Sequence, residues 1–312
     1  MNKILLLGDL VPQAKQKISD LGYEFDVLPN AQSFEQLDPQ EFSAYEGIIV
    51  RNIEPVDPRF ITKLPNLKII ARNGAGTDNV PIELATKRNI WVSNTPGANA
   101  QAVAEHALAL AFYLLKDFGS NKMSKENDIA TAVGSELHGK TVGIVGWGFI
   151  AKRFAELMSA LGANVIFYNR SKRKSTFAKQ VGLAELFSAS DIISLHIPVT
   201  PDTKYMITHD LIKNTQKQPI LINTSRGELV KNAVLLKGLQ QGLLSAVGLD
   251  VYDNDEDSLE KLLSLPNVVV TNHSAALTAE SLAAMAIGAI NNVDAVIKNG
   301  KPLNPINALN KN

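Results

Sequence analysis

The chain has 312 residues, 45% of them hydrophobic and 20% charged, and its 31 basic residues balance its 31 acidic ones. This length can supply two domains with full cores, and the neutral balance offers no basic excess to nucleic acid or to an anionic membrane. There is no cysteine, which excludes disulfides, thiolate metal sites and thiol nucleophiles.

The chain begins with a short apolar strand rather than a signal peptide, and it contains no apolar run of roughly 18 residues that could span a bilayer. We therefore expect a cytoplasmic protein without membrane or nucleic-acid partners. Nothing in the composition indicates a metal site.

Short apolar runs typical of buried strands alternate with helical patterns along the whole chain. The predicted strands are Ile4–Leu7, Phe25–Leu28, Gly47–Val50, Leu67–Ala71, Ile90–Ser93, Val142–Val145, Val165–Tyr168, Ile192–His196, Ile220–Asn223, Ala246–Asp250 and Val268–Thr271. The predicted helices include Gln13–Leu21, Pro81–Lys87, Asn99–Asp117 and Thr278–Lys298. The alternation predicts an α/β protein with parallel sheets, and the strands are too many for one comfortable doubly wound sheet, so we expect two.

A glycine turn follows the predicted strand Val142–Val145, as Gly146-Trp147-Gly148-Phe149-Ile150-Ala151, and a helical pattern and a second strand come next. Gly146 would permit the tight turn, and Gly148 would let the backbone approach a pyrophosphate at the helix N-terminus. This strand, turn, helix and strand order predicts a dinucleotide site. A glycine turn in another α/β fold is the alternative.

The residue after the second strand of that unit is Asn169, where an NAD site usually has a carboxylate for the ribose hydroxyls. Arg170, Ser171 and Lys172 follow it at once. An amide followed by basic and hydroxyl groups can accept a 2′-phosphate that a carboxylate would repel. The pattern favours NADP, and a solvated basic loop with NAD bound is the alternative.

Two further strand ends carry chemistry. Arg226 lies in Asn223-Thr224-Ser225-Arg226-Gly227, and His273 follows Val268–Thr271. A fixed cation and an ionisable imidazole can hold a carboxylate and move a proton.

With these motifs in place, the chain resembles the D-isomer-specific 2-hydroxyacid dehydrogenases over nearly its whole length, and most of all their phosphoglycerate dehydrogenase-type members. The segments 71–80, 94–106 and 194–203 carry the resemblance together with the motifs above. It implies two Rossmann-like domains with the site in a cleft between them. Residues 1–97 and 277–312 would form the substrate-binding domain, residues 98–276 would form the dinucleotide-binding domain, and the protein would be a homodimer.

The resemblance also implies roles for individual residues. Arg226 would grip the substrate and His273 would transfer the proton. Substrate contacts are expected from Arg51, Arg72, Asn73, Gly74, Ala75 and Gly76. Cofactor contacts are expected from Val103, Gly146, Gly148, Phe149, Ile150, Asn169, Arg170, Ser171, Lys172, His196, Ile197, Pro198, Thr203, Thr224, Ser225 and Asp250.

The acidic partner of the imidazole departs from the family pattern. Asp255 stands where the family has a glutamate, and Glu256 follows it. A carboxylate beside His273 would raise the pKa of the imidazole. We expect Asp255 in this role, with Glu256 as the alternative.

The expected function is hydride transfer between a nicotinamide cofactor and a 2-keto or D-2-hydroxy acid. The two arginines Arg51 and Arg72 favour phosphohydroxypyruvate or 3-phosphoglycerate. An unphosphorylated acid such as glyoxylate or hydroxypyruvate is the alternative. A protein that binds a dinucleotide as a sensor, without catalysis, is an alternative of a different functional class. The presence of Arg226, His273 and the acidic residues together argues against it.

Overall fold

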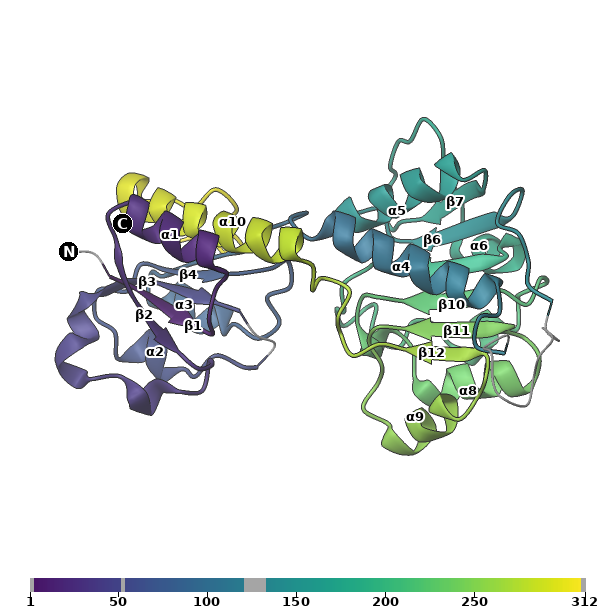
Figure 1. The fold of residues 1–312 in the computed structure, drawn as a ribbon, viewed down its shortest axis with the longest axis horizontal. Helices are drawn as coiled ribbons and strands as arrows, with labels where there is room; N and C mark the ends of the chain where they lie inside the picture. The colour runs from purple at the N-terminus through teal and green to yellow at the C-terminus, as the bar shows by residue number, and fades with distance from the viewer. Residues whose placement is uncertain (1–2, 52–53, 121–132, 310–312) are drawn as a thin grey trace. The chain divides into compact units, whose positions relative to one another are not determined.

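The computed structural model describes residues 3–51, 54–120 and 133–309, and they form two compact units. The first unit contains residues 1–99 and 278–312, and the second contains residues 100–277. Each unit is built around one parallel sheet with helices on both faces (Figure 1). The expected α/β class with two doubly wound parallel sheets is confirmed.

The first unit has five strands in the order β2-β1-β3-β4-β5. These are β1 (Lys3–Leu7), β2 (Glu24–Leu28), β3 (Tyr45–Val50), β4 (Ile69–Arg72) and β5 (Trp91–Ser93). All of the pairings are parallel, so every turn that follows a strand lies at the same edge of the sheet.

Alternate residues of these strands enter different cores. On one face, Ile4 and Leu6 pack with α1 (Pro12–Asp20) and α10 (Ala279–Asn299). On the other face, Leu5 and Leu7 pack with Phe60 of the short helix α2 (Arg59–Thr62) and with Ala85 of α3 (Ile82–Lys87). The 3-10 turns η1 (Phe34–Gln36) and η2 (Pro39–Ala44) lie between β2 and β3. The unbroken apolar runs follow from this burial on two sides.

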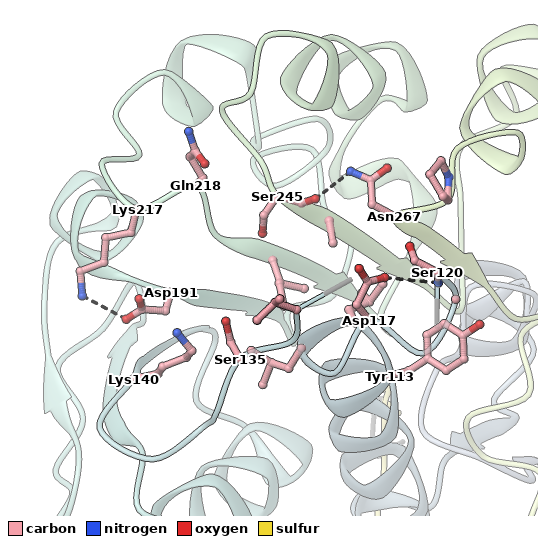
Figure 2. A pocket seen from close by; sticks show the side chains of 17 residues that line it. Tyr113, Asp117, Ser120, Ser135, Lys140, Asp191, Lys217, Gln218, Ser245 and Asn267 are labelled. Carbon is pink, nitrogen blue, oxygen red and sulfur yellow. Dashed lines mark hydrogen bonds and ion pairs between the residues drawn. The ribbon is translucent and has the colours of Figure 1, made fainter. Parts of the chain in front are cut away.

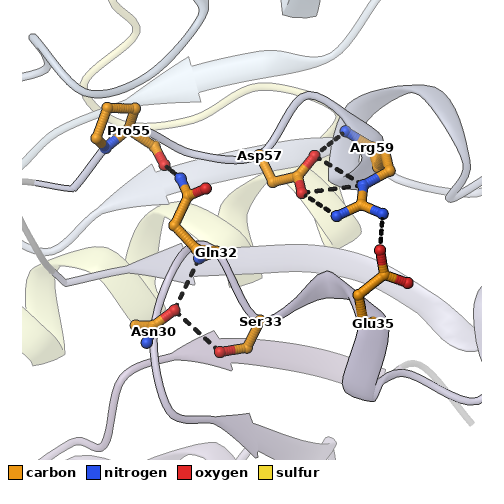
Figure 3. A network of polar contacts seen from close by, with 7 residues as sticks. All are labelled: Asn30, Gln32, Ser33, Glu35, Pro55, Asp57 and Arg59. Carbon is orange, nitrogen blue, oxygen red and sulfur yellow. Dashed lines mark hydrogen bonds and ion pairs between the residues drawn. The ribbon is translucent and has the colours of Figure 1, made fainter.

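A polar network joins the turns that follow β2 and β3 (Figure 3). Asp57 pairs with Arg59 at 2.6 Å, and Arg59 also contacts Glu35. The side chain of Gln32 donates to the carbonyl of Pro55. The network ties Pro55 and Asp57 to the segment that follows β2.

The second unit has seven strands in the order β12-β11-β10-β9-β6-β7-β8, all paired in parallel. These are β6 (Thr141–Val145), β7 (Asn164–Tyr168), β8 (Lys179–Gln180), β9 (Ile192–Leu195), β10 (Ile220–Asn223), β11 (Ala246–Leu249) and β12 (Val268–Val270). The strand order reverses between β9 and β6. This is the switch point at whose carboxyl side ligands bind in open α/β sheets.

Helices cover both faces of this sheet. The helices α4 (Ala100–Leu115) and α5 (Phe149–Ala160) pack on one face. The other face is covered by α6 (Leu183–Ala189), α7 (His209–Ile212) and α8 (Asn232–Gln240), with α9 (Glu256–Leu263) contributing Leu262. The 3-10 turn η3 (Gly227–Leu229) follows β10.

All eleven predicted strands are present, with ends that shift by one or two residues, and β8 is the strand that the sequence analysis missed. The two predicted long helices are α4 and α10. Among the described residues, no helix is long and apolar enough to cross a membrane.

Candidate active site

The glycine turn after β6 has the conformation that the sequence requires. Gly146 has φ +105°, and a Cβ there would lie 2.4 Å from the carbonyl oxygen of His196, at the end of β9. Gly148 is the N-cap of α5, and a Cβ on it would meet no protein atom within 4 Å. Gly146 therefore allows the ends of β6 and β9 to pack closely, and Gly148 leaves the N-terminus of α5 accessible to a ligand.

The residues around this turn fit a dinucleotide phosphate. The first turn of α5 carries no acidic residue, so no side-chain charge opposes the helix dipole there. Trp147 is buried and stacks on Phe167 of β7 with ring centroids 3.8 Å apart, which anchors the turn. Phe149, the first residue of α5, is 65% exposed, and the next residue is Ile150. Val103 of α4 is buried.

The loop after β7 folds on itself. The side-chain amide of Asn169 donates to the carbonyl and to the hydroxyl of Ser171, at 3.0 and 3.1 Å. Arg170 is exposed and lies 3.5 Å from the carboxylate of Asp202, and Lys172 is exposed as well. An exposed pair of this kind contributes at most about 1 kcal/mol, so the guanidinium can leave it for a stronger partner.

The ends of β9 and β10 are joined by side chains. The hydroxyl of Ser225 donates to the carbonyl of Ile197 at 2.5 Å, and that of Thr203 donates to the carbonyl of Pro198 at 2.7 Å. Thr224 is 9% exposed, and its hydroxyl has no hydrogen-bond partner within the described protein. A buried hydroxyl in this state is a candidate for a bound group, because leaving it unpaired is costly.

The imidazole of His196 accepts or donates one hydrogen bond, to the hydroxyl of Ser194 at 2.9 Å, and its ring lies 5.3 Å from that of Phe154. Burial lowers the pKa of His196 to about 3, because the charged form would lose its hydration. His196 is therefore neutral in the folded protein and is a structural part of the switch point rather than a proton carrier.

Asp250, after β11, is 1% exposed and organises the loop that carries His273. Its Oδ1 accepts from the hydroxyl of Thr271 at 2.6 Å and from the N–H of Ser274 at 2.8 Å, and its Oδ2 accepts from the N–H of Ala275 at 3.0 Å. The N–H of His273 donates to the carbonyl of Asp250 at 2.9 Å. These bonds stabilise the left-handed backbone of His273, whose φ is +49°.

His106 of α4 takes part in the same cluster, and the sequence analysis assigned it no role. Its Nε2 lies 2.9 Å from the hydroxyl of Thr271 and 3.5 Å from Oδ1 of Asp250. The available signal was the pair of ionisable residues Glu105 and His106 on a helix that is otherwise mostly apolar.

Arg226 follows β10, and one of its guanidinium nitrogens donates to the carbonyl of Ser225 at 2.8 Å. It lies in the same stretch as the unpaired hydroxyl of Thr224. The carboxyl ends of β10, β11 and β12 thus carry Arg226, Asp250 and His273 in turn, as expected for a site at this edge.

Asp255 has a local role that was not foreseen. Its carboxylate caps α9 by accepting from the N–H of Ser258 at 3.3 Å. The pKa of Asp255 is lowered, first by a hydrogen bond with the side chain of Ser258 and then by this backbone bond. Glu256, the alternative, is exposed in the first turn of α9. Pairing of either carboxylate with His273 stays a prediction.

In the first unit, the predicted substrate residues follow β3 and β4. Arg51 is exposed and donates to the carbonyl of Asp9 at 2.7 Å. Arg72 donates to the carbonyl of Asn73. Its guanidinium lies over Gly74, where a Cβ would come within 2.5 Å of a guanidinium nitrogen.

The turn at residues 73–76 is held from β5. The N–H of Gly74 donates to the hydroxyl of Thr95 at 3.0 Å, and the side chain of Asn94 donates to the carbonyl of Ala75 at 2.6 Å. Gly74 is buried and its N–H is engaged. Ala75 and Gly76 are half-buried, and binding of an anion by the N–H groups of this turn stays a prediction.

A cavity of 340 Å³ opens at the opposite edge of the second sheet (Figure 2). Its lining includes the first residues of β10 and β11, and a pair between Lys217 and Asp191 at 3.0 Å crosses its wall. Because it lies at the amino ends of the strands, it is not part of the candidate site. Among residues 3–51, 54–120 and 133–309, no group of three or more His, Asp or Glu side chains is placed to hold a metal ion.

Comparison with known proteins points to one family of enzymes. Residues 108–275 match the NAD-binding domain of the D-isomer specific 2-hydroxyacid dehydrogenases. The chain is 34% identical over 276 residues to a glyoxylate reductase of Thermococcus litoralis, which covers 84% of this chain and 83% of the relative. It is also 34% identical over 287 residues to a D-3-phosphoglycerate dehydrogenase of Archaeoglobus fulgidus, covering 89% of this chain but 54% of the relative.

The fold is similar to a crystal structure of the NADPH-dependent glyoxylate/hydroxypyruvate reductase of Sinorhizobium meliloti in complex with citrate. The TM-score is 0.88 at 26% identity, and the match covers 98% of each chain. With the glycine turn, the switch point and the Arg226 and His273 strand ends in place, the chain belongs to the D-isomer specific 2-hydroxyacid dehydrogenase family of NAD(P)-dependent oxidoreductases.

Proposed function

We propose that this enzyme is an NADPH-dependent reductase of a small, unphosphorylated 2-keto acid of the glyoxylate and hydroxypyruvate class. The observation that carries the cofactor choice is the end of β7, where Asn169, Arg170, Ser171 and Lys172 occupy the place of a ribose-binding carboxylate.

The preference follows from charge. A 2′-phosphate carries up to two negative charges, and Arg170 and Lys172 supply positive charge on an exposed loop. A charge-assisted hydrogen bond contributes roughly 1.5–3 kcal/mol, so one or two of them give on the order of 10- to 10³-fold preference over NADH. Asp202 opposes this through its exposed pair with Arg170, but that pair is the weaker interaction.

The substrate proposal rests on the local bonds of the two arginines. Arg51 and Arg72 each donate to a neighbouring backbone carbonyl. Side chains used in this way support the turns that follow their strands, which weakens the case for a dedicated phosphate site. The glyoxylate reductase of Thermococcus litoralis supports the same choice, since it matches over 83% of its own length.

Phosphohydroxypyruvate is the second candidate. It is favoured by the two arginines at one sheet edge and by the similarity to the Archaeoglobus fulgidus D-3-phosphoglycerate dehydrogenase. The chain spans about half the length of that relative.

The chemistry needs a hydride at C2 of the keto acid and a proton at its oxygen. The nicotinamide supplies the hydride when it is bound. Arg226 would hold the substrate carboxylate and polarise the carbonyl through its fork of donors. His273 would give the proton to the developing alkoxide, and the Asp250 cluster keeps the backbone of its loop in one conformation.

The test is a matrix of kcat/KM values for NADPH and NADH with glyoxylate, hydroxypyruvate and phosphohydroxypyruvate. We expect higher values with NADPH and with the unphosphorylated acids. Asn169→Asp combined with Arg170→Ala should reverse the cofactor order, because it adds a repulsive charge and removes an attractive one. A preference for NADH in the unmodified enzyme would overturn the cofactor proposal, and a preference for phosphohydroxypyruvate would overturn the substrate proposal.

A further inference from the structure

The loop after β7 is held by a side chain from outside the loop. Gln180, the second residue of β8, reaches across to three backbone groups of residues 169–173. Its Nε2 donates to the carbonyl of Asn169 at 2.9 Å and to the carbonyl of Ser171 at 3.1 Å. Its Oε1 accepts from the N–H of Arg173 at 2.8 Å.

The loop has few other constraints. Residues 170–174 are exposed, and the sheet gives no ladder bond to them because β7 ends at Tyr168. Two further hydrogen bonds run from the side chain of Asn169 to Ser171, within the loop itself, and Arg170 forms an exposed ion pair with Asp202. The amide of Gln180 is therefore the main tie between the loop and the sheet.

The position of Gln180 is set by the sheet. Phe167 of β7 is its register partner in the parallel pairing with β8. Gln180 is half-buried, and its side-chain amide supplies both the donors and the acceptor of the three bonds to the loop.

We propose that Gln180 is a positioning residue for the cofactor's 2′-phosphate: it holds residues 169–173 in the conformation in which Arg170, Ser171 and Lys172 can meet that group together. The inference rests on the proposed NADPH preference and extends it to a residue that does not touch the phosphate. A loop that is already ordered loses less conformational entropy when the 2′-phosphate binds, so binding is tighter. NADH has no 2′-phosphate, so its binding gains little from the same order.

Equilibrium binding without turnover tests this. Calorimetry would measure the affinity of the enzyme for 2′,5′-ADP and for 5′-AMP, which differ only in the 2′-phosphate. The variant is Gln180→Met, which keeps the length of the side chain and removes both donors and the acceptor. The matched control is Gln240→Met, at an exposed position on α8.

We expect the unmodified enzyme and the Gln240→Met control to bind 2′,5′-ADP at least tenfold more tightly than 5′-AMP. In Gln180→Met the affinity for 2′,5′-ADP should fall about tenfold while that for 5′-AMP changes by less than threefold. In steady-state assays the KM for NADPH should rise with little change in kcat. If Gln180→Met does not fold, Gln180→Ala, which removes the same donors and acceptor without adding a charge, is measured in the same way.

The outcomes separate the two proposals. Discrimination by the unmodified enzyme that persists unchanged in the Gln180 variant would overturn the role of Gln180 and leave the cofactor preference standing. An equal loss of affinity for both ligands would also overturn it, because that is the signature of general damage to the domain. No discrimination in the unmodified enzyme would overturn the cofactor preference itself, and the role of Gln180 with it.

Discussion

The two glycines of the turn after β6 should fail in different ways when each is changed to alanine. Gly146 has φ +105°, and an added Cβ would lie 2.4 Å from the carbonyl oxygen of His196 and 2.7 Å from Cγ2 of Ile197. Gly148 has φ −86°, and its added Cβ would meet no protein atom within 4 Å. The first change therefore acts on the fold and the second on the ligand.

For Gly146→Ala, the disfavoured backbone costs roughly 1–3 kcal/mol, and forcing two strand ends apart costs a similar amount. We expect the free energy of unfolding to fall by about 3 kcal/mol or more. For a domain of this size, about 2–4 °C per kcal/mol corresponds to a fall in Tm of roughly 6–12 °C. Thermal unfolding followed by circular dichroism measures it.

For Gly148→Ala, the loss of stability should stay below about 1 kcal/mol, since glycine and alanine differ modestly at an N-cap. The methyl group would stand where the pyrophosphate approaches the helix N-terminus. Losing one charge-assisted bond of roughly 1.5–3 kcal/mol weakens binding about 10- to 100-fold, which calorimetry with NADP⁺ would detect. Similar Tm values for both variants, or unchanged cofactor affinity in Gly148→Ala, would refute this division of roles.

Three further outcomes follow from the site. His273→Ala should lower kcat by on the order of 10²-fold or more through loss of proton transfer, and near-full turnover would exclude His273 as the acid. Asp255→Ala should lower the Tm by roughly 2–4 °C through loss of the α9 cap, while Asp255→Asn keeps the cap. If Asp255 also pairs with the imidazole of His273, Asp255→Asn shifts the basic limb of the pH profile of reduction to lower pH, and an unchanged profile would restrict Asp255 to capping. His196 has its pKa lowered to about 3 in the fold, so the unfolded chain takes up the proton first as the pH falls below the ordinary value of 6.5. Stability should therefore drop by about 1.4 kcal/mol per pH unit between roughly pH 6.5 and 3, and His196→Asn should flatten urea-unfolding free energies between pH 7.5 and 5; an equally steep fall in the variant would assign the acid sensitivity to other groups.

The sheets could be predicted because parallel strands that are buried on both faces have continuous apolar sequences. Each of the eleven predicted strands has such a run. The missed strand β8 consists of Lys179 and Gln180, two polar residues at the edge of the sheet that pair only with β7. Hydrophobic periodicity cannot reveal a strand of this kind.

The residues expected to carry the chemistry of the site could be predicted because they follow strand ends. The residues that hydrogen-bond to the same loops could not. His106 reaches Thr271 across 165 residues of sequence, and no local pattern encodes that contact. The cap at Asp255 is different, because an aspartate before Glu256 and Asp257 is a helix-start signal that sequence reasoning could have used. The resemblance to the family suggested instead that Asp255 pairs with the imidazole of His273.

The loop held by Gln180 lies where substitutions can accumulate during evolution with little effect on the fold. Residues 170–174 are exposed and contribute nothing to either core of the second unit, and surface substitutions of this kind usually alter stability by no more than about 0.5 kcal/mol. The pyrophosphate turn lies on a different connection, between β6 and α5. If this loop sets the choice between NADPH and NADH as proposed above, a few substitutions at its surface positions change that choice while both cores of the unit and the glycine turn stay the same.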